Sequence, residues 1–149
     1  MKTDIKNLLN EAIKNTENAY APYSKYKVGA ALLSKSGKVY SGANIENASF
    51  GATVCAERVA FLKAVSEGEK SFSALALCGK KIKAGTEKEY LSKKEEYVID
   101  KDCTPCGICR QTMAEFCNED FKIYVAQSEN EFKEYTLKEL FLNGFKIKK

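Results

Sequence analysis

The amino-acid sequence predicts a single α/β domain, covering residues 1–149, in which helices cover a sheet. Three observations lead to this prediction. A chain of 149 residues with 44% hydrophobic residues can bury one core and is too short for two ordinary domains. Stretches with helical spacing alternate along the chain with short apolar stretches that are typical of strands. The sequence contains no internal repeat, linker or low-complexity segment.

The first half of the chain predicts two helices that flank a hairpin. Apolar residues at helical spacing open the chain, and Pro22 ends that pattern. Ser36-Gly37 lies between two short apolar stretches and is typical of a hairpin turn. Gly68 suits the C-terminal cap of the second helix. The predicted helices cover residues 4–19 and 54–65, and the predicted strands cover residues 28–33 and 38–43.

The second half predicts further strands and helices around one charged segment. Residues 80–101 are dense in Lys and Glu and have no strong period, so we expect an exposed excursion with an edge strand near its end. Thr104 is a good N-cap and Pro105 is tolerated in a first helical turn. The predicted strands cover residues 72–78, 97–99 and 121–126, and the predicted helices cover residues 104–117 and 137–141.

Composition and charge exclude several classes of function. The N-terminus is charged where a signal peptide would be apolar, and no run approaches the length of a membrane span, so we expect a cytosolic protein with no membrane partner. The net charge of +4 comes from lysines interleaved with Asp and Glu, which is typical of a solvated surface. Only Lys80, Lys81, Lys83 and the C-terminal lysines are grouped, so nucleic acid is not an expected partner.

The cysteines indicate a metal site. Six cysteines in a cytosolic protein are expected to be reduced, and the chain has no histidine, so zinc chemistry would rest on thiolates and carboxylates. Cys55 starts one predicted helix, and Cys106 and Cys109 start another with C-x-x-C spacing. A helix N-terminus favours the thiolate that a metal requires. Three protein ligands leave a fourth position for water, as in a catalytic zinc site.

Two other metal sites remain possible from the spacing alone. Cys103, Cys106 and Cys109 could form part of an iron–sulfur site with Cys117, although this spacing is not that of bacterial ferredoxins. A closed structural zinc site with four cysteines is the second alternative. Cys78, in an apolar strand, is expected to be a small buried hydrophobe.

Several motifs together resemble those of one enzyme family. Cys55-Ala56-Glu57 and Pro105-Cys106-Gly107-Ile108-Cys109-Arg110-Gln111 resemble the C-A-E and P-C-x-x-C-R-Q motifs of the cytidine deaminases, in their three-cysteine, homotetrameric branch. Asn44-Ile45-Glu46-Asn47-Ala48 and Val28-Gly29-Ala30-Ala31-Leu32 match upstream segments of that family. The resemblance implies a three-layer α/β/α sandwich with a central mixed sheet of about five strands, one Zn²⁺ per chain and a homotetramer.

The resemblance also implies a reaction. Zinc held by Cys55, Cys106 and Cys109 would supply a hydroxide that attacks C4 of cytosine, while Glu57 relays protons to N3 and to the leaving ammonia. Cytidine and 2′-deoxycytidine would give uridine and 2′-deoxyuridine, as in pyrimidine salvage. Arg58 would donate hydrogen bonds to cysteine sulfurs and offset their negative charge. The only arginines of the chain are Arg58 and Arg110, each within three residues of a cysteine of this set.

A group of residues is expected around the nucleoside. Asn44 and Glu46 are two apart at the end of a predicted strand, so their side chains should share a face. The family uses the matching residues to bind ribose. The resemblance also places Ala56, Tyr26 and Phe145 beside the substrate, with Phe145 reaching into a neighbouring subunit. Packing in the core of its own subunit is the alternative role for both aromatic residues.

Departures from the family pattern leave other functions open. Ser49-Phe50-Gly51-Ala52-Thr53 replaces the usual C-Y-P-x-G and could alter the rim of the pocket. A deaminase of a modified cytosine nucleoside, similar to the blasticidin deaminases, is therefore one alternative, although those enzymes lack the N-x-E pair. A non-catalytic zinc- or nucleic-acid-binding module is another, and it gives no reason for an acidic residue such as Glu57 beside an open metal position.

Overall fold

A mixed β-sheet forms the centre of the molecule in the computed structural model, which describes residues 2–86 and 95–147. Within these residues the sheet has six strands. They are β1 (Lys27–Ser34), β2 (Val39–Ala43), β3 (Phe72–Ile82), β4 (Tyr97–Asp100), β5 (Lys122–Ala126) and β6 (Phe132–Thr136). The strand order is β2-β1-β3-β5-β6, and β4 pairs with the end of β3.

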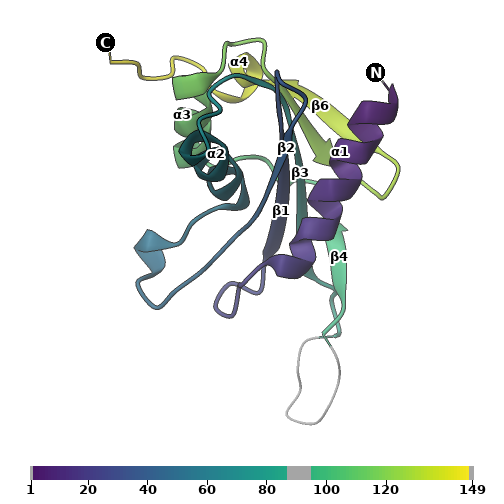
Figure 1. Ribbon diagram of the computed structural model, residues 1–149. Helices are drawn as coiled ribbons and strands as arrows, with labels where there is room; N and C mark the ends of the chain where they lie inside the picture. Colours follow the sequence, from purple (N-terminus) through teal and green to yellow (C-terminus); the bar gives the residue numbers. More distant parts are fainter. Residues whose placement is uncertain (1, 87–94, 148–149) are drawn as a thin grey trace.

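Helices cover both faces of this sheet, as Figure 1 shows. α1 (Lys2–Asn15) packs on one face against β1 and β3, and α2 (Ala56–Ser66) and α3 (Gly107–Phe116) lie on the other. Alternate residues of β3 belong to two separate hydrophobic clusters, because successive side chains of a strand point to opposite faces. Ala74 and Ala76 join the α1 cluster, whereas Leu75 and Leu77 join the α2 and α3 cluster. The predicted three-layer α/β/α sandwich is confirmed.

The strand directions explain why α2 and α3 begin at the same edge of the sheet. β2 and β3 are both antiparallel to β1, and β3 is parallel to β5. The three strands therefore run in one direction. α2 connects β2 to β3, and α3 lies in the connection from β3 to β5. Both helices lie on one face, so both N-termini lie at the carboxyl ends of these strands.

Most predicted elements are confirmed, with shifts of at most four residues at their ends. The first helix ends at Asn15 and a 3₁₀ turn, η1 (Thr16–Asn18), follows it. Gly68 has φ +94°, its N–H donates to Val65, and the N–H of Glu69 donates to the Ala64 carbonyl. These bonds satisfy the last carbonyls of α2, as expected for a glycine C-terminal cap.

The structure corrects the prediction for the start of α3. Thr104 is not the N-cap, because residues 104–105 remain outside the helix and Cys106 takes that position with an extended backbone, φ −68° and ψ 170°. The Thr104 hydroxyl instead accepts a hydrogen bond from Arg110, 3.5 Å away.

The sheet is also larger than predicted. Residues 80–82 belong to β3 and not to an excursion, and the expected edge strand near residues 97–99 is β4. β6 has no counterpart among the predicted strands. Its first three residues are exposed, so burial leaves little apolar pattern in the sequence. A short helix, α4 (Leu137–Leu140), follows β6 where a terminal helix was predicted, with a capping box between Thr136 and Glu139.

Parts of the chain lie outside the described residues. They include residues 87–94 of the predicted charged excursion and the two C-terminal lysines. The single domain over residues 1–149 therefore stays a prediction. None of the helices in the described part of the chain combines the length and apolar character needed to span a membrane.

Candidate active site

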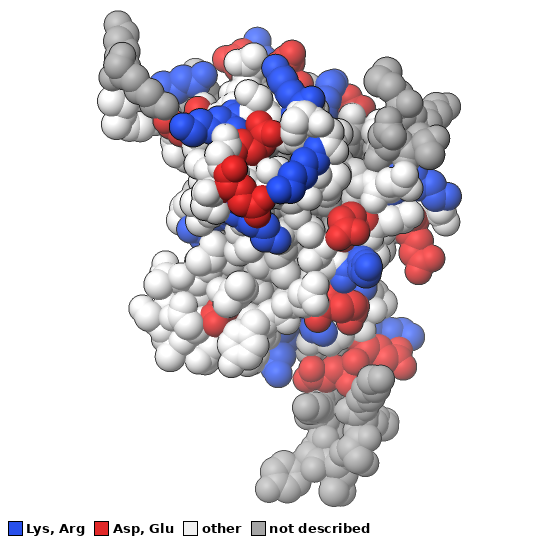
Figure 2. Space-filling model, viewed as in Figure 1, with Lys and Arg blue, Asp and Glu red and all other residues white. Residues whose placement is uncertain are grey.

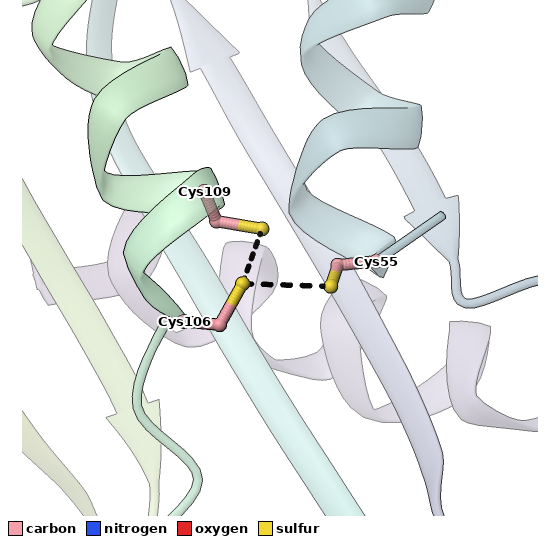
Figure 3. Close-up of side chains that lie close together, drawn as sticks. All are labelled: Cys55, Cys106 and Cys109. Atoms are coloured by element: carbon pink, nitrogen blue, oxygen red, sulfur yellow. Dashed lines mark hydrogen bonds between the residues drawn. The ribbon is translucent and has the colours of Figure 1, made fainter. Parts of the chain in front are cut away.

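Three cysteine sulfurs from two helix starts lie close together at the edge where α2 and α3 begin. The Sγ of Cys106 lies 3.7 Å from that of Cys55 and 3.5 Å from that of Cys109. All three sulfurs lie within 4.8 Å of one another. Figure 3 shows the three side chains pointing toward one another across the gap between the helices. Within the described residues no other cysteine joins this cluster, and both Cys103 and Cys117 are buried elsewhere.

These distances fit one tetrahedral zinc ion. With zinc–sulfur bonds of about 2.3 Å, two sulfurs on a tetrahedral ion are about 3.8 Å apart. The two sulfur pairs around Cys106 are within a few tenths of an ångström of that value. Cys109 is buried and Cys106 is exposed, so the cluster has one side open to solvent. Three ligands with an open side suit a metal that also binds a water molecule.

The local backbone aims helix dipoles at the sulfurs. Cys55 and Cys106 are the N-caps of α2 and α3, and neither side chain makes a capping hydrogen bond. Cys109 follows in the first turn of α3. The free N–H groups of two helix starts therefore face this cluster and favour thiolates.

Arg58 adds positive charge beside Cys55. One Nη of its guanidinium donates to the Thr53 carbonyl at 2.9 Å and lies 3.8 Å from the Cys55 sulfur. Hydrogen bonds from the Cys109 thiol and from Arg58 lower the pKa of the Cys55 thiol to about 5. The pKa of Cys109 is raised because its proton is shared with Cys55 and its side chain is buried. The Arg58 Nε–H is buried without a hydrogen-bond partner among the described residues.

Glu57 lies in the first turn of α2, next to the cluster. Its side chain is only 4% exposed. Burial raises the pKa of its carboxyl to about 7, and the nearby charge of Cys55 adds to this rise. A carboxyl with this pKa can both accept and give up a proton near neutral pH.

Asn44 and Glu46 follow β2 and share a face, as predicted. Both are buried, at 8% and 2% exposed, whereas Ile45 between them is 48% exposed. The Asn44 amide bridges two backbone groups, accepting from the Val28 N–H and donating to the Tyr26 carbonyl, both at 2.8 Å. Glu46 Oε1 accepts from the N–H groups of residues 23 and 24 at 3.1 and 3.0 Å. Both side chains thus also hold the segment before β1.

Tyr26 and Ala56 both belong to the packing between the sheet and α2. Tyr26 packs against the cluster of hydrophobic residues between the sheet and α2, and its hydroxyl donates to Asp100 Oδ2 at 2.8 Å. Ala56 is fully buried as the first residue of α2. A Cβ placed on Gly42 would lie only 2.3 Å from the Ala56 carbonyl oxygen, so the start of α2 packs directly on bare backbone of β2.

Phe145 does not close the core of its own chain, because its side chain is 68% exposed. The Gln111 amide donates to its carbonyl at 2.6 Å and attaches the C-terminal segment to α3. Arg110 makes a second attachment: its Nε donates to Pro105 and one Nη donates to Leu140, both at 2.6 Å. One arginine thus joins the residue before Cys106 to the C-terminal segment.

Sequence reasoning missed the contacts of Asp100, Arg110 and Gln111. Arg110 and Gln111 end the P-C-x-x-C-R-Q motif, and the scarcity of arginine in the chain is a signal for Arg110. Asp100 ends a charged stretch, and nothing in the sequence connects it with Tyr26, 74 positions earlier.

The fold and the three-sulfur cluster together define a zinc enzyme. Residues 2–125 match the family model described as the cytidine and deoxycytidylate deaminase zinc-binding region. This chain belongs to the cytidine and deoxycytidylate deaminase family.

Individual relatives agree with this membership. A cytidine deaminase of Sporosarcina psychrophila is 42% identical over 142 residues, covering 95% of this chain and 91% of the relative. Another, of Halalkalibacterium halodurans, is 44% identical over 138 residues, covering 93% and 91%. The crystal structure of cytidine deaminase from Burkholderia pseudomallei superimposes with a TM-score of 0.73 at 34% identity, covering 93% of this chain and 97% of that one. The predicted family, enzyme class and zinc cofactor are confirmed.

Proposed function

We propose that this protein catalyses the hydrolytic deamination of cytidine and 2′-deoxycytidine to uridine and 2′-deoxyuridine, with release of ammonia. One observation carries the proposal: a buried glutamate, Glu57, lies two residues after Cys55 and next to three sulfurs spaced for one zinc ion. A structural zinc site has no use for an acid at that place. The activity named for the relatives supports the same reaction.

Cys55, Cys106 and Cys109 would hold the zinc, one ion per chain. When bound, zinc activates a water molecule for attack on C4 of the cytosine ring. Glu57 takes one proton from the attacking water and passes it to N3 of the ring. It then takes the remaining proton of the hydroxyl added at C4 and passes it to the amino group, which leaves as ammonia. Its burial supports this role, because a carboxyl with a raised pKa exchanges protons readily near neutral pH.

Arg58 tunes the metal site. Three thiolates exceed the charge of Zn²⁺ by one, which disfavours ionisation of a bound water. The Arg58 guanidinium lies 3.8 Å from the Cys55 sulfur and offsets this negative charge. Its Nε–H, buried and without a hydrogen-bond partner among the described residues, is one further donor on the same guanidinium.

The nucleoside is held from several sides. Asn44 binds a sugar hydroxyl with the amide hydrogen that its bond to the Tyr26 carbonyl leaves free, and Glu46 with Oε2, whose one backbone contact, from the Ser24 N–H, is long at 3.4 Å. Ala56 and the Tyr26 ring contact the base. Phe145, exposed in its own chain, packs on the base in the pocket of a neighbouring subunit.

A homotetramer supplies that neighbour. Four apolar side chains around the segments before β1 and after β2 support such an assembly, each between 48% and 59% exposed: Tyr20, Tyr23, Ile45 and Phe50. The rings of Tyr23 and Phe50 are 6.2 Å apart, and a backbone bridge pairs Tyr20 with Ile45. Figure 2 shows a largely uncharged area at the lower left, where Figure 1 shows the segment between β2 and α2. Contiguous apolar surfaces of this kind are typical of protein interfaces.

The cellular role follows from the substrate and the thiols. Free nucleosides are the substrates of pyrimidine salvage, and three ligand cysteines require the reducing conditions of the cytosol. Nucleic acid is not a partner in this proposal. On the face in Figure 2, Lys and Arg side chains are mixed with Asp and Glu and form no continuous basic stripe.

An ultraviolet assay with cytidine tests the function when it is combined with metal analysis. We expect turnover of cytidine and deoxycytidine by protein that carries about one zinc per chain. Glu57→Gln is the matched control, because it keeps the shape of the side chain and removes the acid; we expect zinc retention with turnover lowered at least about 100-fold. Turnover of blasticidin S or another modified cytosine nucleoside, with none of cytidine, would favour the alternative raised by the altered rim at residues 49–53.

A further inference from the structure

β4 brings the end of the charged segment back to the active-site edge of the sheet. It pairs antiparallel with the last residues of β3, and its final residue, Asp100, lies opposite Gly79. On the other side of β3, Val28 of β1 also lies opposite Gly79. Gly79 is therefore flanked by the strand that follows Tyr26 and by the strand that ends at Asp100.

The Tyr26 side chain crosses β3 at this glycine. Its hydroxyl donates to Asp100 Oδ2 at 2.8 Å. A Cβ on Gly79 would lie 2.3 Å from that hydroxyl and 2.6 Å from the Cys103 sulfur. Real carbon atoms do not approach so closely, so the contact between Tyr26 and Asp100 requires a residue without a side chain beneath it.

Both ends of Tyr26 are fixed. Its carbonyl accepts from the Asn44 amide at 2.8 Å and its N–H donates to the Ser24 hydroxyl at 3.1 Å. Asp100 holds the tip of the ring. The Cys103 sulfur lies beside that tip, and the Tyr26 ring packs against the hydrophobic cluster that includes Ala56 and Cys109. Tyr26 therefore connects Asn44, proposed to bind the sugar, with the hydrophobic cluster at the starts of α2 and α3.

Asp100 is well suited to fix a hydroxyl. Its side chain is 17% exposed, and its second oxygen, Oδ1, receives Lys81 Nζ at 3.0 Å. Burial opposes ionisation, but Lys81 and the Tyr26 hydroxyl together lower the pKa of Asp100 below its usual value. A carboxylate accepts a shorter and stronger hydrogen bond than a neutral group does.

We propose that Asp100 is a positioning residue of the substrate site, which holds the Tyr26 ring across Gly79 so that β4 contributes to the affinity for the nucleoside. In the described part of the chain, the Asp100 carboxylate contacts Tyr26 and Lys81 and none of the proposed metal ligands. It acts through Tyr26, and it gives β4 a role in substrate binding. This inference depends on the proposed cytidine deamination.

Kinetics of four variants test the inference: Asp100→Ala, Asp100→Asn, Tyr26→Phe and the double variant of Asp100→Ala with Tyr26→Phe. We expect Asp100→Ala to raise KM for cytidine about fivefold and to change kcat less than about twofold, because binding and not chemistry is affected. Asp100→Asn keeps an acceptor oxygen and should recover most of the affinity. The dissociation constant of the product uridine, measured by calorimetry, should rise in parallel with KM.

The double variant tests whether Asp100 affects substrate binding through Tyr26. If Asp100 acts through Tyr26, adding Asp100→Ala to Tyr26→Phe should change KM no further. Additive effects of the two substitutions would overturn the inference. Lys83→Ala is the matched control, because Lys83 lies in the same hairpin, pairs with Glu96 at 3.3 Å and should keep the wild-type KM.

Zinc content and thermal unfolding separate this inference from simpler outcomes. If the wild type is active and zinc-loaded Asp100→Ala has the same KM, the role of Asp100 is overturned and the proposed function stands. A zinc-loaded wild type without cytidine turnover would overturn the proposed function. If Asp100→Ala does not fold, Tyr26→Phe decides, since it removes the donor and leaves Asp100 paired with Lys81: a KM raised about fivefold, as expected for Asp100→Ala, supports the inference, and an unchanged KM refutes it.

Discussion

Gly42→Ala should disturb the active site by displacing the start of α2. The new Cβ would lie 2.3 Å from the Ala56 carbonyl oxygen and 2.7 Å from the Ala60 backbone nitrogen. Both are backbone atoms, so no change of side-chain rotamer relieves the overlap. A carbon and an oxygen in contact are normally about 3.3 Å apart, so α2 must move by about 1 Å. The moved turn carries Glu57 and follows Cys55 directly.

The size of the effect follows from this displacement. Overpacking of this kind costs about 1–3 kcal/mol, which for a chain of this size lowers the midpoint of thermal unfolding by about 3–10 °C. Misplacing catalytic groups by about 1 Å can reduce turnover about 100-fold. We therefore expect Gly42→Ala to remain folded at the assay temperature, with kcat greatly reduced and zinc bound more weakly.

Thermal unfolding, zinc titration and cytidine kinetics measure these effects. Gly107→Ala is the matched control, because it lies beside Cys106 at the start of α3 and its added Cβ would have no atom within 4 Å. The control should keep the wild-type unfolding midpoint and kcat. If Gly42→Ala also kept both, the tight contact of α2 with β2 would not be what positions the catalytic turn.

Three further predictions concern the ligands, the arginine and the C-terminal segment. Cys103→Ala should retain about one zinc per chain and Cys106→Ala should lose it; metal analysis with the opposite result would exclude the assigned ligand set. Arg110→Ala removes charged donors from two carbonyls and should lower the free energy of unfolding in urea by about 2–4 kcal/mol, a reading that an unchanged urea midpoint would contradict. Phe145→Ala should raise KM for cytidine clearly and lower the midpoint of thermal unfolding only slightly. Light scattering should show a tetramer, and an active monomer would be inconsistent with a shared site.

Much of the fold could be predicted because burial leaves a regular pattern in the sequence. Buried side chains recur at helical spacing in α1, and β3 contains a continuous apolar stretch because both of its faces are buried. The predicted positions of these two elements are therefore close to the observed ones. β6 is largely exposed and carries no such pattern. The start of α3 was misplaced because Thr104 is a better N-cap by propensity than Cys106, whereas the observed cap brings a sulfur toward Cys55.

The candidate site divides in the same way. The ligand cysteines and Glu57 could be found because they fall into two short motifs: Cys55 lies two positions before Glu57, and Cys106 lies three positions before Cys109. The partner of Tyr26 could not, since Asp100 meets it only when β1, β3 and β4 are assembled. The same holds for Arg110, whose acceptor at Leu140 is 30 positions away. Local spacing reveals ligands, whereas contacts between distant strands and helices appear only in the folded chain.

The distance in sequence between the two cysteine-bearing helix starts has a consequence for the unfolded chain. Cys55 and Cys106 are 51 positions apart. An ion held by both would close a loop of that length, just as a covalent crosslink would. By the chain-entropy relation for crosslinks, such closure reduces the freedom of the unfolded ensemble by about 4 kcal/mol. A chelator would therefore do more than stop turnover: it would release this constraint and let the chain explore conformations in which α2 and α3 separate.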